Sequence, residues 1–479
     1  MTDRLHVPGL TDDEERILNL LVEQLNNKSR RNSLRSAYYD GKYAVRQIGS
    51  VIPPQYAKLG LVLGWSAKAV DTLGRRCNLD TFVWPDGDLA DLGFRDAWDQ
   101  NFLGQEIASA RTASLIHGVS FLINTQGVEG EPKSLVHAKD ALNATGQWNT
   151  RKRALDSLLS VTSWDRKGGG TITGFVLYLP GVTISADKTD GQWQIDRSTH
   201  PWGVPAEPMI YKPRTGRPLG SSRISRAVMS LHNQALRTVI RLEAHMDLYA
   251  IPKMVLLGAN ESIFKNPDGS MKTSWQVVMG RIFGIPDDDD APSDALARAD
   301  VKQFSAESPE PQITALKQQA MLFSGETSIP LTSLGVSDLS NPTSADSYIA
   351  SREDLIAEAE GATDDWSPSL RRMMLRALAI QNGMDTIPAE WQSIEPKWRS
   401  PIYLSRAAAA DAGLKQMQAV PWLAETEVGL ELLGLDEQQV QRAMAEKRRA
   451  AGRGVLNALR QRAAVPEAPV PPVTDDDGV

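Results

Sequence analysis

Four consecutive aspartates, Asp287, Asp288, Asp289 and Asp290, are the side chains of this sequence best suited to hold a divalent cation. Carboxylate oxygens are the ligands that Mg²⁺ and Ca²⁺ prefer, and a metal-dependent nuclease would need them. Such nucleases draw their carboxylates from separate elements, whereas adjacent residues of one loop seldom converge on one ion. We therefore interpret the run as a solvated acidic loop, with partner docking as the hypothesis for its role.

The other chemically capable residues lack the neighbours that their chemistry requires. The six histidines and the single Cys77 contain no convincing pair of a nucleophile and its base. His117 precedes a glycine at an expected helix end, where a histidine usually packs or binds carbonyl groups. The glycines at 168–170 are not followed by Gly-Lys-Ser or a helix start, which favours a hairpin tip over a phosphate cradle. We expect no catalytic residue, no bound metal and no cofactor.

The charge of the chain limits its contact with nucleic acid. The basic residues between positions 28 and 35 could bind phosphate, but a solvated helix face or turn is the favoured interpretation. The whole chain has a formal charge of −7 and a pI near 5.6. Because broad binding to nucleic acid requires an excess of Lys and Arg, any DNA contact should be local or weak. The sequence also lacks a Gly-x-x-x-x-Gly-Lys-[Ser/Thr] loop, so it does not indicate an ATP-hydrolysing motor.

The length and the apolar content predict more than one domain. The chain has 479 residues, of which 41% are hydrophobic, and single cores stop growing near about 250 to 300 residues. No run of about 18 apolar residues and no signal-peptide pattern occur, so we expect neither a membrane span nor secretion. A lone cysteine cannot form an intrachain disulfide, which is compatible with a reducing compartment.

A long helix expected at 223–249 is the element around which the chain would be organised. Nothing within it breaks a helix, and Pro252 follows its end. At 1.5 Å per residue it would be about 40 Å long. Its polar, basic face carries Arg226, Arg237 and Arg241. The opposite face is an apolar stripe at three- and four-residue steps, formed by Ile224, Val228, Leu231, Ala235, Val239, Leu242, Met246 and Tyr249.

The remaining pattern predicts an α+β, mainly helical fold. Helices are expected at 10–25, 65–76 and 108–116, and short antiparallel strands at 119–124, 175–179, 183–185 and 193–195. A small α/β module at 259–305 separates the long helix from a second helix within 309–335. A further helix starts at Thr343 and is kinked or restarted near Pro368. Shorter helices follow at 405–417, 422–433 and 437–449, and the Pro-rich acidic tail is expected to be disordered.

The order of these pieces resembles the phage portal proteins, specifically the siphophage portal family common in phages of actinobacteria. The resemblance covers about residues 35–420; each motif is weakly specific alone, whereas their order and spacing are specific. The motifs are Tyr38-Tyr39-Asp40-Gly41, the 65–76 helix with Val70-Asp71, Gly220-Ser221-Ser222-Arg223-Ile224, the stretch from Ile251-Pro252 to Leu257-Gly258, Ser328-Ile329-Pro330-Leu331-Thr332-Ser333-Leu334-Gly335, and Asn341-Pro342-Thr343-Ser344-Ala345.

The resemblance implies a portal fold with wing, stem, clip and crown that assembles as a ring, a dodecamer in the family. The implied parts are an N-terminal wing with the strands (1–220), a first stem helix (221–250), a clip (251–305), a second stem helix (306–335), a tunnel loop (336–343), a long wing helix (344–383), crown helices (384–464) and a disordered tail (465–479).

The resemblance also implies a function, which is not enzymatic. The ring would sit at one capsid vertex of the virion as the head-to-tail connector and would be assembled in the host cytoplasm. Double-stranded DNA would pass through it during packaging and ejection. Its implied partners are other copies of itself, the terminase large subunit, a head-tail adaptor protein, the major capsid protein and the scaffold, without a membrane. The alternatives are a metal-dependent nuclease of the packaging apparatus and a capsid or scaffolding subunit.

Two sets of residues are hypotheses for the channel. The polar side chains of Asp338, Ser340, Asn341 and Thr343 would face DNA in the tunnel loop, which has no Lys or Arg. A ring that lets DNA pass must not bind it tightly, and such a loop fits that demand. The stem arginines fit a wholly negative channel poorly. We favour their pairing with acidic side chains of a neighbouring subunit, and the alternative is a cationic belt on DNA.

Overall fold

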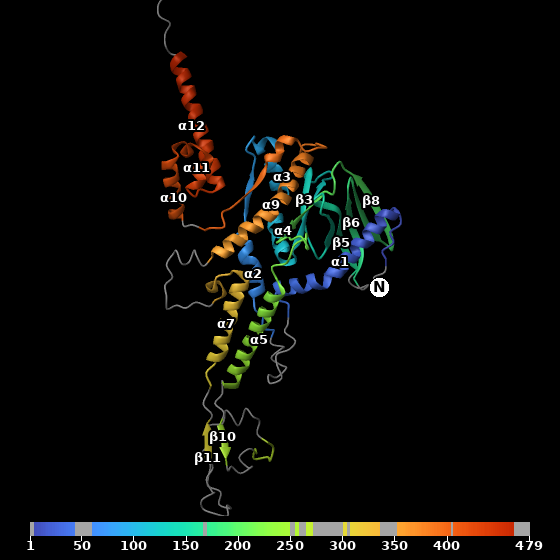
Figure 1. Cartoon of the computed structure of the whole chain (residues 1–479), viewed down its shortest axis with the longest axis vertical. Helices are drawn as coiled ribbons and strands as arrows, with labels where there is room; N and C mark the ends of the chain where they lie inside the picture. The colour runs from blue at the N-terminus through green and yellow to red at the C-terminus, as the bar shows by residue number, and fades with distance from the viewer. Residues whose placement is uncertain are drawn as a thin grey trace, which may run out of the picture. The chain divides into compact units, whose positions relative to one another are not determined.

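The computed structural model of this protein describes residues 4–43, 60–165, 170–249, 254–257, 265–271, 300–303, 307–335, 352–403 and 406–463. The chain forms two compact units, which divide between Pro401 and Ile402. The first unit combines helices with antiparallel sheets, and the second is helical in its described part (Figure 1). The predicted α+β fold class is therefore confirmed.

The N-terminal helix α1 (Asp12–Tyr39) begins at a capping box. The Glu14 N–H donates to the Thr11 hydroxyl, and the Thr11 N–H donates to the Glu14 carboxylate at 2.8 Å. The helix is longer than the predicted 10–25 because no residue breaks it before Asp40 and Gly41, where a φ of +67° turns the chain. The basic residues at 28–35 therefore lie on a helix.

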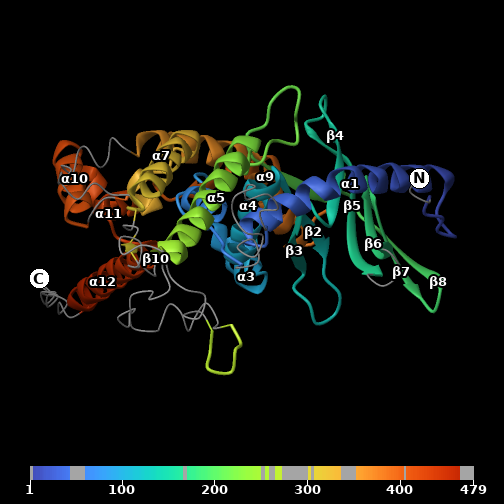
Figure 2. The same ribbon diagram turned by 90° about the horizontal axis from the view of Figure 1, so that it is seen from below.

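The β-rich region forms two sheets in the first unit, in the orders β3-β2-β9 and β4-β5-β6-β7-β8, and all their neighbours are antiparallel. The strands predicted at 119–124, 175–179, 183–185 and 193–195 are parts of β2, β6, β7 and β8. Helix α1 lies across the larger sheet, where Leu18 and Leu21 belong to one buried cluster with Leu177 and Ile184 (Figure 2). The strands are β2 (Val119–Gln126), β3 (Ser134–Asp140), β4 (Ala144–Asn149), β5 (Ala154–Asp165), β6 (Thr171–Leu179), β7 (Val182–Thr189), β8 (Gln192–Thr199) and β9 (Ala206–Ile210).

Helix α9 (Glu353–Gln381) is the centre of the largest core and continues through Pro368. We predicted a kink or a restart of the helix at Pro368. The restart is wrong, because contacts on both sides of the proline hold one continuous helix. The Trp366 ring is fully buried, and the Ser369 hydroxyl donates to the Pro208 carbonyl at 2.7 Å. The helices around α9 are α2 (Trp65–Gly74), α3 (Phe94–Gln100) and α4 (Leu103–His117), with 3₁₀ turns η2 (Leu89–Leu92), η4 (Leu331–Leu334) and η5 (Ala389–Ser393).

Residues 384–401, which we expected to belong to the C-terminal helical part, belong to the first unit. Strand β12 (Glu395–Trp398) pairs with β1 (Leu79–Val83), and Trp391 and Ile394 are buried in the α9 core. The second unit begins at Ile402. Its elements are α10 (Arg406–Ala419), η6 (Pro421–Glu425), α11 (Glu427–Leu432) and α12 (Glu437–Ala463). The predicted 422–433 helix divides because Thr426 caps α11, its hydroxyl accepting from the Gly429 N–H.

Candidate functional site: an antiparallel helical hairpin and its buried base

Helices α5 (Arg226–Tyr249) and α7 (Glu310–Thr327) form an antiparallel hairpin (Figures 1 and 2). At its base the Ser225 hydroxyl donates to the Glu326 carboxylate at 3.2 Å. Midway, the Gln319 amide donates to the Thr238 hydroxyl at 2.9 Å. At the far end, the His245 ring lies 3.0 Å from the Glu307 carbonyl oxygen. In the chain between the two helices, strands β10 (Met254–Leu257) and β11 (Asp300–Gln303) pair antiparallel.

The buried side of α5 differs in part from the predicted apolar stripe. Val228 and Ala235 are buried as expected, but Leu231, Val239 and Leu242 are only half-buried and Met246 is 54% exposed. The buried side turns instead toward His232, Leu236, Thr238 and Ile240. The His232 ring is tolerated there because its Nδ1 lies 2.9 Å from the Ser66 hydroxyl of α2, which satisfies a buried polar atom.

The helix also begins later than predicted. Its first residue is Arg226, and the Ser225 hydroxyl accepts a hydrogen bond from the Val228 N–H at 3.1 Å, as an N-cap residue does. Arg223, which we expected inside the helix, therefore precedes it and enters the interior of the unit.

The basic face of α5 is solvent-accessible in a single chain. Arg226 and Arg241 are exposed and Arg237 is half-buried. In the part of the chain that the structure describes, these three guanidinium groups have no ion-pair partner. A row of solvent-accessible, unpaired cations on a long helix is available to a carboxylate or a phosphate from outside the chain.

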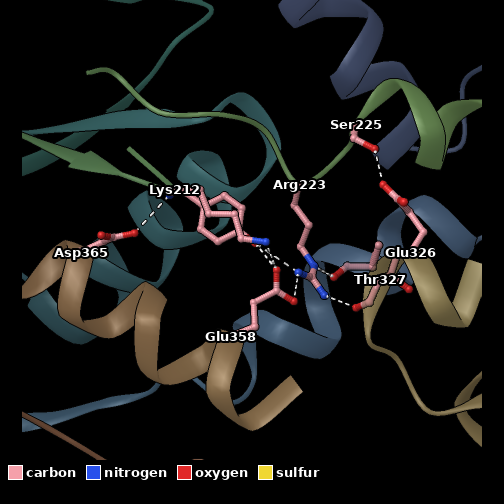
Figure 3. A network of polar contacts seen from close by, with 9 residues as sticks. Lys212, Arg223, Ser225, Glu326, Thr327, Glu358 and Asp365 are labelled. Carbon is pink, nitrogen blue, oxygen red and sulfur yellow. Dashed lines mark hydrogen bonds and ion pairs between the residues drawn. The ribbon is translucent and has the colours of Figure 1, made fainter. Parts of the chain in front are cut away.

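Arg223 joins five segments at the base of the hairpin (Figure 3). Its side chain is 3% exposed, and its Nε donates to the Ala69 carbonyl of α2 at 2.5 Å. Its Nη2 donates to the Thr327 carbonyl at the end of α7 at 2.7 Å. Its Nη1 lies 2.5 Å from a carboxylate oxygen of Glu358 on α9 and 3.1 Å from the Tyr211 hydroxyl. The start of α5 is thus bonded to α2, α7, α9 and the segment after β9.

The carboxylate of Glu358 is shared among three donors. Besides Arg223, the Tyr211 hydroxyl donates to it at 2.7 Å and Lys212 forms a second ion pair with it. Burial by itself would raise the pKa of Glu358, but the charge and hydrogen bonds of Arg223, with those of Lys212 and Tyr211, bring it below its ordinary value. Burial raises the pKa of Tyr211, so its hydroxyl stays protonated and donates. A buried ion pair with these additional hydrogen bonds fixes the start of α5 relative to α9.

Gly220 positions the chain just before Arg223. Its φ is +74°, and a Cβ there would lie 2.4 Å from the Tyr211 carbonyl oxygen and 2.6 Å from that of Gly118. Only glycine allows both this backbone conformation and this approach. After it, the Ser221 N–H donates to the Tyr211 carbonyl at 2.9 Å, and the Arg223 N–H donates to the Leu115 carbonyl at 2.8 Å. The structure therefore explains two residues of this motif, namely Gly220 by its backbone conformation and Arg223 by its buried contacts.

Part of this base lies in a motif of the sequence. Gly220 and Arg223 belong to that motif, which by itself predicts no role for either residue. Tyr211, Lys212 and Glu358 were not singled out, and no local pattern marks them because their partners are distant in the sequence. The tunnel-loop residues Asp338, Ser340, Asn341 and Thr343, the acidic residues Asp287, Asp288, Asp289 and Asp290 and the tail after 464 lie outside the described residues.

Among the residues that the structure describes, no three His, Cys, Asp or Glu side chains are grouped so that they could hold a metal ion. No helix among those that the structure describes combines the length and the apolar character that crossing a bilayer requires.

Comparison with known proteins gives matches over most of the chain. The portal proteins of Mycobacterium phage L5 and Mycobacterium phage D29 are each 24% identical to it, over 427 and 426 residues. These alignments cover 85% of this chain and 84% and 82% of the two relatives. A solved structure titled as the neck of a native GTA particle computed with C12 symmetry aligns at 15% identity and a TM-score of 0.40, covering 84% of this chain and 98% of that one. A TM-score this low establishes no shared fold by itself.

A family profile that matches most of the chain shows the family to which it belongs. The profile of the family described as phage portal protein, SPP1 Gp6-like, matches residues 19–453. This range includes the helical hairpin, its base at Arg223, both sheets and most of the second unit. The chain is a phage portal protein and belongs to the SPP1 Gp6-like family.

Proposed function

We propose that this portal protein assembles into a ring of twelve copies at one capsid vertex, around a channel for double-stranded DNA. The α5–α7 hairpin, held at its base by Arg223, is the observation that carries the proposal. A hairpin with one buried and one solvent-accessible basic side can stand beside a second copy of itself, as head-to-tail packing around a closed ring requires. The number twelve is taken from the family resemblance.

In the ring, α5 and α7 would be the two stem helices and the β10–β11 pair would belong to the clip. The wing would comprise the sheets and α9, and the second unit the crown. The polar side chains of Asp338, Ser340, Asn341 and Thr343 would face the DNA. With a net charge of −7 the chain would hold the passing DNA weakly, because each phosphate contact adds affinity that must be broken at every step.

The basic face of α5 would meet a neighbouring subunit. Arg226, Arg237 and Arg241 lack ion-pair partners among the described residues of their own chain. Acidic side chains of the next copy would form ion pairs with them. Apolar side chains would add to this contact, since Met321 is 46% and Leu322 is 52% exposed on α7. Both features are typical of a surface that is covered in an assembly.

The ring would also dock other proteins of the particle. The terminase large subunit and the head-tail adaptor protein would bind at the clip, where the acidic residues Asp287, Asp288, Asp289 and Asp290 would take part. The major capsid protein and the scaffold would contact the ring during assembly in the host cytoplasm.

Electron microscopy of the purified protein, with native mass spectrometry, tests the assembly. We expect rings with a central stain-filled hole. The variant Arg237→Glu/Arg241→Glu should reduce the ring fraction by at least about tenfold, because it replaces attraction across the subunit contact by repulsion. The matched control Lys133→Glu/Arg214→Glu makes the same charge change outside the hairpin and should form rings as the wild type does.

Two results would contradict parts of this proposal. If the wild-type protein stays monomeric at every salt and protein concentration, the proposal that the isolated protein assembles into rings is wrong. Full ring formation by the Arg237→Glu/Arg241→Glu variant would exclude intersubunit pairing and favour the cationic belt on DNA, which a loss of packaging in the same variant would then support.

A further inference from the structure

We propose that a basic cavity between α1 and β4 is a binding site for a phosphate group. The cavity has a volume of about 450 Å³ and lies where α1, the start of β2, β4 and the loop before Arg223 meet. Four cations line it, namely Lys28, Arg31, Arg35 and Arg217. The site is separate from the hairpin and its basic face, and the inference goes beyond the proposed channel.

No carboxylate balances these four cations. None of the residues that line the cavity is an aspartate or a glutamate. In the described part of the chain, no ion pair involves Lys28, Arg31, Arg35 or Arg217. Other cations of this protein do have such partners, as Arg197 has Glu14 at 2.6 Å. A concave cluster of unpaired cations favours an anion from outside the chain.

The deepest cation is incompletely bonded. The Arg35 Nη1 donates to the His117 carbonyl at 3.0 Å, but its buried Nε has no partner. The Nδ1 atom of His117, which also lines the cavity, is likewise buried and unpartnered. Both residues line the cavity, so an anion bound there would lie near two polar groups that lack a hydrogen-bond partner.

The cations repel one another in the absence of a ligand. Burial and the charges of Arg31 and Arg217 lower the pKa of Arg35 to about 10. Burial and the charge of Arg31 also lower the pKa of Lys28. All four groups line the same cavity, and an anion bound there would relieve the repulsion between them.

The walls of the cavity are held in place by hydrogen bonds. The Gln24 amide of α1 donates to the Thr145 hydroxyl at 2.6 Å and to the Gly146 carbonyl at 3.0 Å. About two turns further along α1, the buried Asn32 amide donates to the Ala141 carbonyl at 2.9 Å. The helix that carries three of the cations is therefore fixed against β4 before any ligand binds, which lowers the entropic cost of binding.

The chemistry of the cavity selects a phosphate group. A carboxylate carries one charge on two oxygens, whereas inorganic phosphate carries up to two charges at neutral pH on four oxygens. A DNA phosphodiester carries one charge, and its two free oxygens match the forked donors of arginine. The volume suits a small group and is far too small for a folded partner. The phosphate could be free inorganic phosphate or part of a DNA backbone that reaches the wing, and the experiment separates these sources.

Binding of inorganic phosphate to the full-length protein tests the inference by calorimetry at constant ionic strength. We expect saturable binding in the wild type. The variant Arg31→Gln/Arg217→Gln, which changes two exposed cations, should lower the affinity by at least about tenfold. The control Arg30→Gln changes an exposed cation next to Arg31 that does not line the cavity, and its affinity should equal that of the wild type.

A short double-stranded oligonucleotide distinguishes the two sources. Competition with inorganic phosphate that is lost in the Arg31→Gln/Arg217→Gln variant would assign the cavity to a DNA phosphate. Phosphate binding without such competition would assign it to a free phosphate. The inference is overturned if the wild type shows no saturable binding, if the double variant binds phosphate as tightly as Arg30→Gln does, or if acetate at the same ionic strength binds equally well.

Discussion

Two buried histidines and one half-buried histidine make this protein sensitive to acid at the scale of single residues. Burial lowers the pKa of His232 to about 4, and burial also lowers the pKa values of His117 and His137 to about 4. Between pH 6.5 and 4 the unfolded chain binds protons at these positions and the folded chain does not. The free energy of unfolding therefore rises with pH in this window and falls as the pH drops through it.

We predict that His232→Gln weakens this pH dependence. A shift of this size in one group changes the free energy of unfolding by as much as about 3 kcal/mol between pH 7 and pH 4, and the variant lacks that group. Denaturant unfolding followed by fluorescence at several pH values measures the slope. Ser230→Ala, an exposed change on the same helix, should keep the wild-type slope, and an unchanged slope in His232→Gln would show that another group dominates.

At the scale of elements, the Arg223 network determines how the hairpin is attached to the rest of the unit. The same guanidinium is bonded to α2, to the end of α7 and to Glu358 of α9. Because α5 and α7 are antiparallel, the start of α5 and the end of α7 both lie at the base of the hairpin, and this one guanidinium holds both.

We predict that Glu358→Gln lowers the free energy of unfolding by about 3 kcal/mol, because it leaves a buried guanidinium without its counter-charge. Denaturant unfolding gives the value. Asp13→Asn, which breaks the exposed pair with Arg16, should cost less than about 1 kcal/mol. The double variant Arg223→Met/Glu358→Leu should be more stable than Glu358→Gln. If the double variant is the less stable of the two, the hydrogen bonds of Arg223 outweigh its charge.

At the scale of the whole molecule, the boundary between the two units lies after Pro401. The β1–β12 pair and the buried Trp391 and Ile394 make residues 384–401 part of the first unit. A chain without residues 402–479 therefore loses no part of that core. A chain without residues 384–479 loses a strand and two of its buried side chains.

We predict that a chain ending at Pro401 folds with the thermal stability of the first unit in the full-length protein. A chain ending at residue 383 should unfold at a lower temperature by several degrees, because it exposes the surface that Trp391 and Ile394 cover. Circular dichroism melting curves of both chains provide the comparison. Equal melting temperatures would mean that residues 384–401 contribute little to the core.

The sequence alone determined the order of the elements and the family. Helix periodicity and turn residues are local, so the hairpin helices and strands β2, β6, β7 and β8 were predictable from neighbouring residues. The portal resemblance was predictable for a related reason. It rests on short motifs in a fixed order, and the order is written in the chain itself.

The tertiary structure alone decided the contacts between distant residues. A polar His232 lies on the buried side of α5 because Ser66 is opposite it, and Pro368 lies inside one helix because its neighbours are packed on both sides. Glu358 counters Arg223 across the fold, and the cations of α1 meet Arg217 at a cavity. Such pairings depend on which surfaces fold against one another, and no local pattern encodes this because each partner is an ordinary residue in its own segment.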